Sequence, residues 1–144
     1  MLSPKFVEME LAVAIHDDLI ETFGGSFGLR DEGLLESALS QPKASFFGQL
    51  LHPTIAEQAA AYFYHLAKNH PFVDGNKRTA LGVTEAFLGM NGYELEFSDE
   101  DLYYQVLAVV EGKLEKKDLA DLLRSHLIFD SSAVNSEDLP SLEL

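Results

Sequence analysis

Apolar residues recur along most of the chain at intervals of three and four, the spacing that places them on one face of an α-helix. Ser3 and Pro4 predict the start of a first helix, because serine caps helices and proline fits their first turn. The pair Gly24-Gly25 predicts its end. Its apolar stripe contains Phe6, Met9, Val13, Ile20 and Phe23. His16 falls on the same stripe, so we interpret it as a hydrogen-bonded core histidine and not as a catalytic one.

A glycine-rich loop over 24–30 precedes a short helix that Asp31 caps and that ends near Ser40. The segment 41–53 has no helical pattern, although it carries Phe46, Phe47, Leu50 and Leu51. Apolar residues on such a connection fit a lid or a surface that docks an extended partner. Packing into the core is the other interpretation, and the sequence leaves both open.

Thr54 and Glu57 form a capping-box pattern at the start of a strongly apolar helix. This helix should end near Asn69, because Pro71 disfavours helical geometry at the residue before it. His70 is thereby left on the connection, where its side chain can point into a cleft.

The next helix is predicted over 76–90, with Asn91-Gly92 as its stop. It has almost no polar face, which is typical of a helix in the middle of a bundle. Gly82 and Gly89 lower its helix propensity, and we expect close approach of a neighbouring helix at both positions.

Beyond it, 93–97 reads as a short extended link, and Ser98 and Asp101 cap a further helix that Gly112 closes. A last helix is predicted over 115–127. Period-2 strand patterns are missing, so we expect an all-α bundle of about six helices around a buried central helix. We assign 1–129 to one folded domain and 130–144, rich in Ser, Asp and Glu, to an acidic disordered tail.

The composition narrows the possible functions. The chain has 144 residues, 47% of them hydrophobic, and no cysteine, which excludes disulfides and thiolate chemistry. No window is long and apolar enough to span a membrane, so we expect a cytoplasmic protein. The net charge of −14 disfavours binding to nucleic acid but allows a small nucleotide at a local basic site. Lys77-Arg78 is the candidate for such a site, and a merely solvated basic pair is the other interpretation. Lys116-Lys117 is the other adjacent pair of cations.

The segment from His70 to Ala80 brings the chemistry together at the start of the central helix. A helix start binds phosphate oxygens through its unpaired N–H groups and partial positive charge. Asp74 is suited to hold Mg²⁺ together with phosphate, and His70 to accept a proton near neutrality. The candidate phosphate-binding residues are Gly75, Asn76, Lys77 and Arg78.

Three other motif families do not fit. The segment 75–79 lacks the earlier glycine and the preceding strand of a P-loop. His65 and His70 are five residues apart, whereas a helical zinc pair is separated by four. His16-Asp17 spells the dipeptide of helical HD phosphohydrolases, but no histidine precedes it.

The stretch from His70 to Arg78 resembles the core motif of the Fic/Doc (Fido) family, His-x-Phe-x-Asp/Glu-Gly/Ala-Asn-Gly/Lys-Arg, at every fixed position. The resemblance extends over roughly residues 4–127 and includes Gly-Leu-Arg30-Asp-Glu-Gly-Leu-Leu-Glu-Ser37. It is closest to the death-on-curing (Doc) branch, the toxins of toxin–antitoxin modules. The resemblance implies that His70 is the catalytic base, Asp74 the magnesium ligand, and Asn76, Lys77 and Arg78 the phosphate rim.

One departure concerns the reaction. Fic enzymes that transfer AMP carry glycine where Lys77 stands and a second arginine where Leu81 stands. Doc-type proteins carry the lysine and lack that arginine, and they move the γ-phosphate of ATP onto a threonine of elongation factor Tu, which arrests translation. The resemblance therefore favours phosphorylation of a translation-factor hydroxyl. AMP transfer and a non-catalytic binding module on the same fold are the alternatives.

The resemblance also implies a partner. No Ser or Thr is followed by Glu four positions later, so the self-inhibiting motif of some Fic proteins is missing. Restraint should then come from a separate antitoxin whose disordered segment orders as it binds. We take the apolar loop at Phe46-Phe47 as a hypothetical neighbour of the target or the antitoxin.

Overall fold

The computed structural model describes residues 4–96 and 98–130. Six α-helices account for most of these residues, which confirms the predicted all-α bundle. The helices are α1 (Met9–Phe23), α2 (Glu32–Ser40), α3 (Ile55–Asn69), α4 (Asn76–Met90), α5 (Asp99–Val110) and α6 (Lys116–Ser125). A single 3₁₀ turn, η1 (Gln41–Lys43), follows α2.

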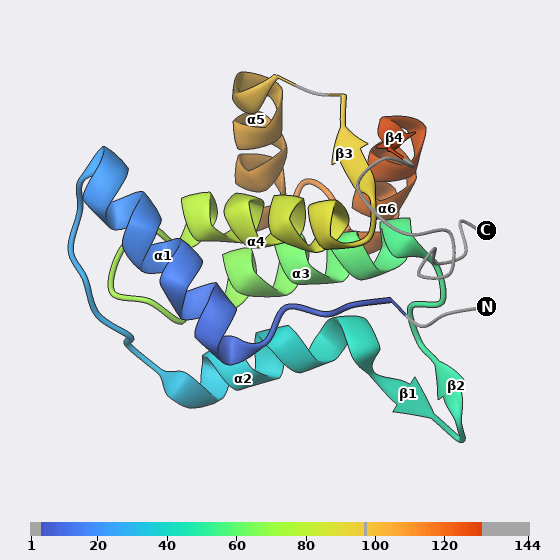
Figure 1. Cartoon of the computed structure of the whole chain (residues 1–144), viewed down its shortest axis with the longest axis horizontal. Coiled ribbons are helices and arrows are strands. Elements are labelled where there is room, and N and C mark those ends of the chain that lie inside the picture. The colour runs from blue at the N-terminus through green and yellow to red at the C-terminus, as the bar shows by residue number, and fades with distance from the viewer. Residues whose placement is uncertain (1–3, 97, 131–144) are drawn as a thin grey trace.

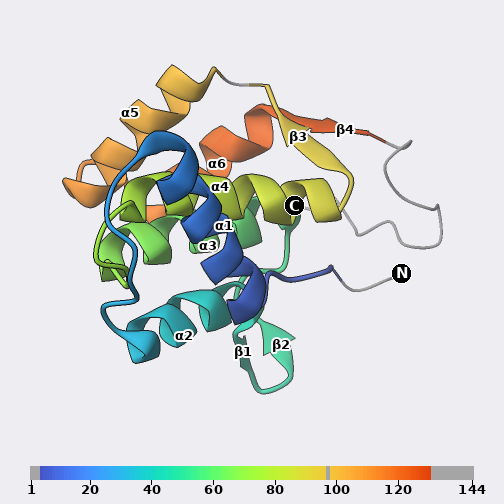
Figure 2. The same cartoon turned by 60° about the vertical axis from the view of Figure 1, so that its left-hand side comes forward.

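Helices α3 and α4 lie side by side at the centre of the bundle and run in opposite directions (Figure 1). Helix α2 packs on one side of α3 and α6 on another, while α1 and α5 contact α4 (Figure 2). Alanines fill much of the buried face of α3, and such small side chains let neighbouring helices come close. The predicted central helix α4 thus shares the centre of the fold with α3.

The predicted caps explain where three helices begin. The Asp31 carboxylate accepts a hydrogen bond from the Leu34 N–H at 2.9 Å at the start of α2. The Thr54 hydroxyl accepts from the Glu57 N–H at 3.2 Å and donates to the Glu57 carboxylate at 2.7 Å. Ser98 accepts from the Asp101 N–H in the same way at 3.1 Å. Each contact satisfies an N–H that has no partner inside its helix.

The two helical glycines of α4 differ. A Cβ on Gly82 would meet Ile15 of α1 at 3.0 Å and Leu19 at 3.1 Å, so the predicted close approach of a helix is confirmed there. A Cβ on Gly89 would meet no atom within 4 Å, because this glycine is on an exposed face of α4. The prediction was wrong at Gly89.

The first helix begins at Met9 and not at Pro4, which corrects the predicted start. Residues 4–8 run extended across the bundle, and their backbone is hydrogen bonded to side chains of the central helices. The Asn91 amide pairs with both backbone groups of Lys5, at 2.8 and 2.9 Å, and the Val7 N–H donates to the Tyr62 hydroxyl at 2.7 Å. These long-range bonds, together with burial of Val7, favour the extended chain over another helical turn.

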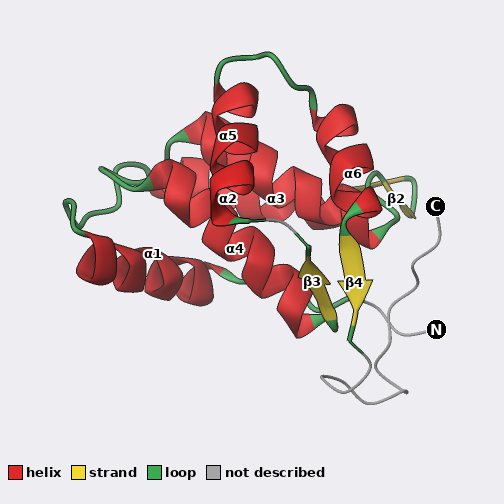
Figure 3. Ribbon diagram, turned by 90° about the horizontal axis from the view of Figure 1, so that it is seen from above, coloured by secondary structure: helices red, strands yellow, loops and turns green. Residues whose placement is uncertain are grey.

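Short strand pairs are present, although the sequence predicted none. Strands β1 (Ser45–Phe46) and β2 (Gln49–Leu50) form a hairpin (Figure 1). Strand β3 (Tyr93–Leu95) pairs antiparallel with β4 (Leu127–Phe129) (Figure 3). Strands of two or three residues are too short to produce a visible period-2 pattern. The last helix consequently ends at Ser125, two residues earlier than predicted, because Leu127 enters β4.

The β1–β2 hairpin projects from the bundle at the end of α3 that is far from the α3–α4 connection (Figure 1). Phe46 and Phe47 are 65% and 90% exposed, so the interpretation that they pack into the core is wrong. They are not a lid over the connection either, because α3 separates the two by about 20 Å at 1.5 Å per residue. A docking role remains a hypothesis.

No helix in the described part of the chain is long and apolar enough to cross a membrane. Most of the predicted acidic tail, residues 131–144, lies outside the described residues.

Candidate active site

The connection between α3 and α4 borders a cleft of about 750 Å³. All six residues that the sequence singles out line this cleft: His70, Asp74, Gly75, Asn76, Lys77 and Arg78. The remaining walls come from the connection itself and from α1, α4 and α5, with Leu19, Phe23, Val73, Leu81, Gly82, Glu85, Glu100, Tyr103 and Val106. The volume falls in the usual range for small-molecule sites.

His70 ends α3 in a left-handed conformation, with φ 50° and ψ 55°. This conformation is unfavourable for a residue with a side chain, so surrounding contacts must hold it. Arg30 supplies them: its Nε donates to the His70 carbonyl at 2.8 Å and its Nη2 to the Asn69 carbonyl at 3.0 Å. These two hydrogen bonds, which we call the Arg30 clamp, leave the His70 side chain exposed at the cleft.

A strip of backbone hydrogen bonds continues this clamp along the connection. The N–H groups of Arg30 and Asp31 both donate to the Pro71 carbonyl, at 2.8 and 3.0 Å. The Val73 N–H donates to the Gly28 carbonyl at 2.9 Å. The glycine-rich loop before α2 therefore acts as a partner strand for the residues after His70, a pairing that the sequence did not reveal.

The first turn of α4 presents free donors to the cleft. Its N-cap is Gly75, in a left-handed conformation with φ 76°, and no side chain caps it. The Gly75 N–H donates to the Asp74 carboxylate at 2.9 Å. The next three N–H groups, those of residues 76–78, belong to the first turn and have no acceptor inside the helix. They make an anion-binding position at the positive end of the helix dipole.

The side chain of Asn76 binds the backbone of the connection and is not available to an anion. Its Oδ1 accepts from the Phe72 N–H at 2.8 Å and its Nδ2 donates to the Phe72 carbonyl at 2.9 Å. Both halves of the amide are thus used to fold the connection back onto the start of α4. What Asn76 retains for an anion is its backbone N–H.

Asp74 is exposed, and contacts from α1 and the loop after it fix its position. One carboxylate oxygen accepts from the Ser26 N–H at 3.0 Å, and His16 contacts the Asp74 carbonyl through Nε2 at 2.8 Å. A Cβ on Gly25 would lie 2.7 Å from the carboxylate, so glycine is required there. His16 is 1% exposed and stacks on Phe72, which confirms the prediction of a hydrogen-bonded core histidine.

The donor set around Asp74 fits Mg²⁺. An ionised carboxylate offers about four acceptor positions, and the two N–H contacts leave some of them free. The described residues contain no cluster of three His, Asp or Glu side chains that would hold a metal by themselves. A magnesium ion at Asp74 would therefore take its other ligands from phosphate and water, which is its usual preference.

Arg78 is held by an aromatic contact from α1. Its guanidinium carbon lies 4.1 Å from the centre of the Phe23 ring, and Phe23 is 60% exposed. The sequence placed Phe23 on the apolar stripe of the first helix, but its exposed ring makes a cation–π contact with the Arg78 guanidinium. Lys77 lines the same cleft as a second positive charge.

The sequence indicated the residues that line the cleft but not which residues support them. The supporting residues are His16, Phe23, Ser26 and Arg30. Each acts on a residue some 40 to 60 positions away, and no spacing rule relates such pairs. Arg30 stood in a segment that matches the family pattern, and this was its only signal.

Comparison with known proteins agrees with this geometry. A model described as the Fic/DOC family matches residues 6–88, which is more than half of the chain. The chain belongs to the Fic/DOC family. Its matched region runs from the extended N-terminal segment into the last turn of α4 and so contains the whole connection described above.

Two relatives carry names from the Doc branch of this family. "Toxin Doc" of Mycolicibacterium smegmatis is 45% identical over 73 residues, which cover 51% of this chain and 56% of that protein. "Protein kinase doc" of Escherichia phage P1 is 30% identical over 120 residues, which cover 83% of this chain and 94% of that protein. The match to the mycobacterial relative thus spans only about half of its length.

Proposed function

We propose that this chain is a Doc-like toxin that transfers the γ-phosphate of ATP onto a serine or threonine hydroxyl of a translation factor, elongation factor Tu, and thereby blocks translation. One observation carries the proposal. An exposed imidazole, that of His70, borders the same cleft as three uncapped amides and two cations at the start of α4. A proton acceptor and a phosphate cradle are the two parts that phosphoryl transfer needs.

In the proposed reaction His70 accepts the proton of the target hydroxyl. The hydroxyl oxygen then bonds to the γ-phosphorus, the bond between this phosphorus and the bridging oxygen breaks, and ADP leaves with the electron pair. The clamp from Arg30 keeps the imidazole at the cleft while the acceptor enters. Proton transfer of this kind contributes roughly 10²- to 10⁴-fold to the rate.

The phosphates are held by the first turn of α4. The N–H groups of residues 76–78 point along the helix axis toward the anion, Lys77 adds a compact charge, and Arg78 can bind two oxygens at once. Magnesium held at Asp74 would neutralise charge on the phosphates. Two acidic residues, Glu85 and Glu100, also line the cleft. Glu85 is two helical turns beyond Arg78, about 10 Å along the axis, and so lies away from the proposed phosphate position at the helix start.

Leu81 favours transfer of the terminal phosphate over transfer of AMP. It lines the cleft one helical turn after Lys77, at the position where AMP-transferring Fic enzymes carry their second arginine. An apolar side chain at this position cannot bind the phosphates of the nucleotide as that arginine does. The name of the phage P1 relative, a protein kinase, supports the same assignment.

The name of the mycobacterial relative supports the role of a toxin and, with it, an antitoxin that keeps this chain inactive. We propose that residues 1–129 form the catalytic domain and that the acidic residues 130–144 lie outside it. We also propose that the protein acts in the cytoplasm, where its translation-factor substrate is found.

The position of the transferred label tests the reaction. Purified protein is incubated with Mg²⁺, elongation factor Tu and ATP labelled at either the γ- or the α-phosphorus, and the labelled residue is located by peptide mass spectrometry. We expect label only from the γ-position, on a serine or threonine. Label from the α-position would identify AMP transfer instead.

His70→Ala should reduce the transfer by at least about 100-fold, because it removes the proton acceptor. His126→Ala is the matched control, since His126 is the residue directly after α6 and its imidazole is outside the cleft lining. Equal transfer by the wild type and His70→Ala would rule out the assigned role of His70. If the wild type transfers no label, and if the wild type and His70→Ala bind the target equally well, the protein is a binding module.

A further inference from the structure

A second cleft, of about 350 Å³, lies between the start of α3 and helix α6 and shares no lining residue with the first. Its lining is His52, Glu57, Lys116, Lys117, Ala120, Asp121 and Arg124. Three of the chain's ten cationic side chains meet here, in a protein of net charge −14. The proposed phosphotransfer makes no use of them.

Lys116 has an unusual setting for a lysine. Its Nζ donates to Nε2 of His65 at 3.0 Å and lies 5.8 Å from the centre of the Tyr64 ring. Among the described residues no carboxylate is within ion-pair distance of it. Burial lowers the pKa of Lys116, and burial together with the Lys116 charge lowers the pKa of His65 to about 4. A neutral His65 imidazole therefore contacts the partly desolvated amine of Lys116.

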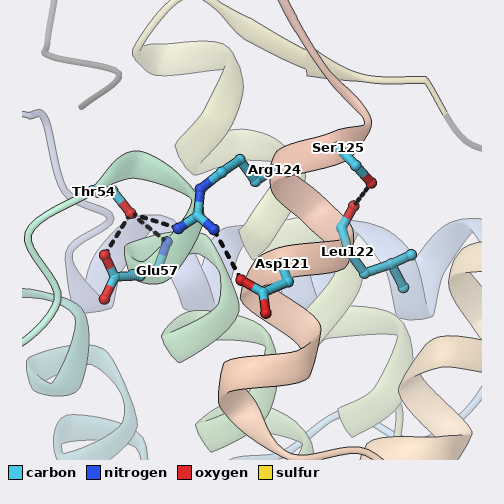
Figure 4. Close-up of polar contacts among 6 residues, drawn as sticks. All are labelled: Thr54, Glu57, Asp121, Leu122, Arg124 and Ser125. Atoms are coloured by element: carbon cyan, nitrogen blue, oxygen red, sulfur yellow. Dashed lines mark hydrogen bonds and ion pairs between the residues drawn. The ribbon is translucent and has the colours of Figure 1, made fainter. Parts of the chain in front are cut away.

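The carboxylates of this cleft are already engaged (Figure 4). Asp121 accepts from Nη1 of Arg124 at 2.9 Å, and Glu57 accepts from the Thr54 hydroxyl at 2.7 Å. Nη2 of Arg124 reaches the same hydroxyl at 3.4 Å, while its Nε is buried without a partner. The cations in the cleft thus outnumber the acids, and the acids have partners that hold them in place.

We propose that Lys116 is an acylation site for small anionic acyl donors of the acyl phosphate class. Lys117 and Arg124 attract the phosphate end of the donor into the cleft, and the Lys116 amine attacks its carbonyl carbon. An N–C bond forms, the C–O bond to phosphate breaks, inorganic phosphate leaves, and the amine's proton passes to water. His65 holds one N–H of the free amine and so leaves the nitrogen lone pair available.

The product is a neutral amide. It removes a positive charge from the contact between α6 and α3, and its bulk must fit beside the Tyr64 ring. Acylation is therefore expected to loosen α6 from α3 as well as to change the charge of this face of the protein.

Site-resolved acetylation tests this assignment on the full chain. The folded protein is treated with acetyl phosphate, and the rate at each lysine is followed by peptide mass spectrometry. Lys68 is the matched control, because its Nζ also lies over Tyr64, at 6.0 Å, but contacts no imidazole. We expect Lys116 to react severalfold faster than Lys68. Equal rates at the two lysines would overturn the proposal.

A second reagent separates the reactive amine from the phosphate-binding cations. A neutral donor, the N-hydroxysuccinimide ester of acetic acid, should modify Lys116 at the same rate in the wild type and in Lys117→Gln or Arg124→Gln. With acetyl phosphate both variants should react more slowly at Lys116. If Arg124→Gln fails to fold, the exposed Lys117→Gln carries the comparison. An unchanged acetyl phosphate rate in Lys117→Gln would rule out an anionic donor.

Discussion

Helices α4 and α6 both carry two adjacent cations in their first turn and have no side-chain cap, yet the surroundings of the two pairs differ. Cations at a helix start are unfavourable, because the start is the positive end of the helix dipole. At α4 the first turn carries no acidic residue, and Lys77 and Arg78 border an open cleft of about 750 Å³. At α6 the first turn contains Asp118, and Lys116 is turned toward His65 in a cleft of about half that volume.

A basic pair at a helix start therefore does not by itself define what the neighbouring cleft binds. In the function proposed above, the α4 pair holds ATP phosphates beside three uncapped amides and the exposed imidazole of His70. Among the described residues, no exposed imidazole lines the α6 cleft, where Lys117 is proposed to attract an acyl phosphate toward the Lys116 amine. Four predictions probe this contrast, in order of decreasing effect.

Of these four changes, Arg78→Gln is expected to have the largest effect. Loss of a charge-assisted hydrogen bond to phosphate costs about 1.5–3 kcal/mol, so kcat/KM for ATP should fall roughly 10- to 100-fold. Lys117→Gln removes the same charge from the start of α6 and should leave kcat/KM unchanged. Steady-state kinetics of the two variants make the test. A comparable loss in both would mean that the overall charge, and not the α4 cleft, governs ATP binding.

Arg30→Ala removes the two hydrogen bonds that hold His70 in its left-handed conformation. Each bond is worth about 0.7 kcal/mol, so kcat should fall by about tenfold. Arg30→Lys should recover part of the loss. NMR chemical shifts of the His70 backbone report its conformation independently of activity. Arg124→Ala is the control, since it lowers stability at α6 without touching His70. Unchanged His70 shifts in Arg30→Ala would contradict the clamp.

The α6 side should respond to acid. The folded-state pKa of His65 is lowered to about 4 from its ordinary 6.5, so the unfolded chain binds the proton more readily between these values. Stability is fully present above pH 6.5 and falls toward pH 4. Because the ring is partly exposed, we expect a loss on the order of 1–2 kcal/mol. Urea denaturation across this pH range measures it, and His65→Gln should flatten the curve.

The smallest effect is expected from Phe23→Leu, which keeps an apolar side chain but removes the ring under Arg78. An exposed cation–π contact is worth about 0.5–1 kcal/mol, so KM for ATP should rise roughly two- to fivefold with little change in kcat. Phe47→Leu, at an exposed ring of the β1–β2 hairpin, is the control. Equal KM values for Phe23→Leu and the wild type would show that Arg78 needs no aromatic support.

Much of the helical fold follows from local signals. The caps at Asp31, Thr54 and Ser98 and the stop at Gly112 act within a few residues, so the sequence locates these helix ends correctly. The start of α1 does not follow in this way. It depends on hydrogen bonds that the backbone N–H groups of residues 5 and 7 donate to Asn91 and Tyr62, which are distant in the chain.

The sequence by itself determined the α3–α4 connection, because Pro71 ends one helix, Gly75 opens the next, and His70, Asp74 and Arg78 are spaced within that single segment. Only the tertiary structure decided how these groups are held. Arg30 reaches the His70 carbonyl, His16 the Asp74 carbonyl, and Phe23 the Arg78 guanidinium. Local propensities act over a few residues, whereas such supports arise only when α1 and the loop before α2 pack against the connection.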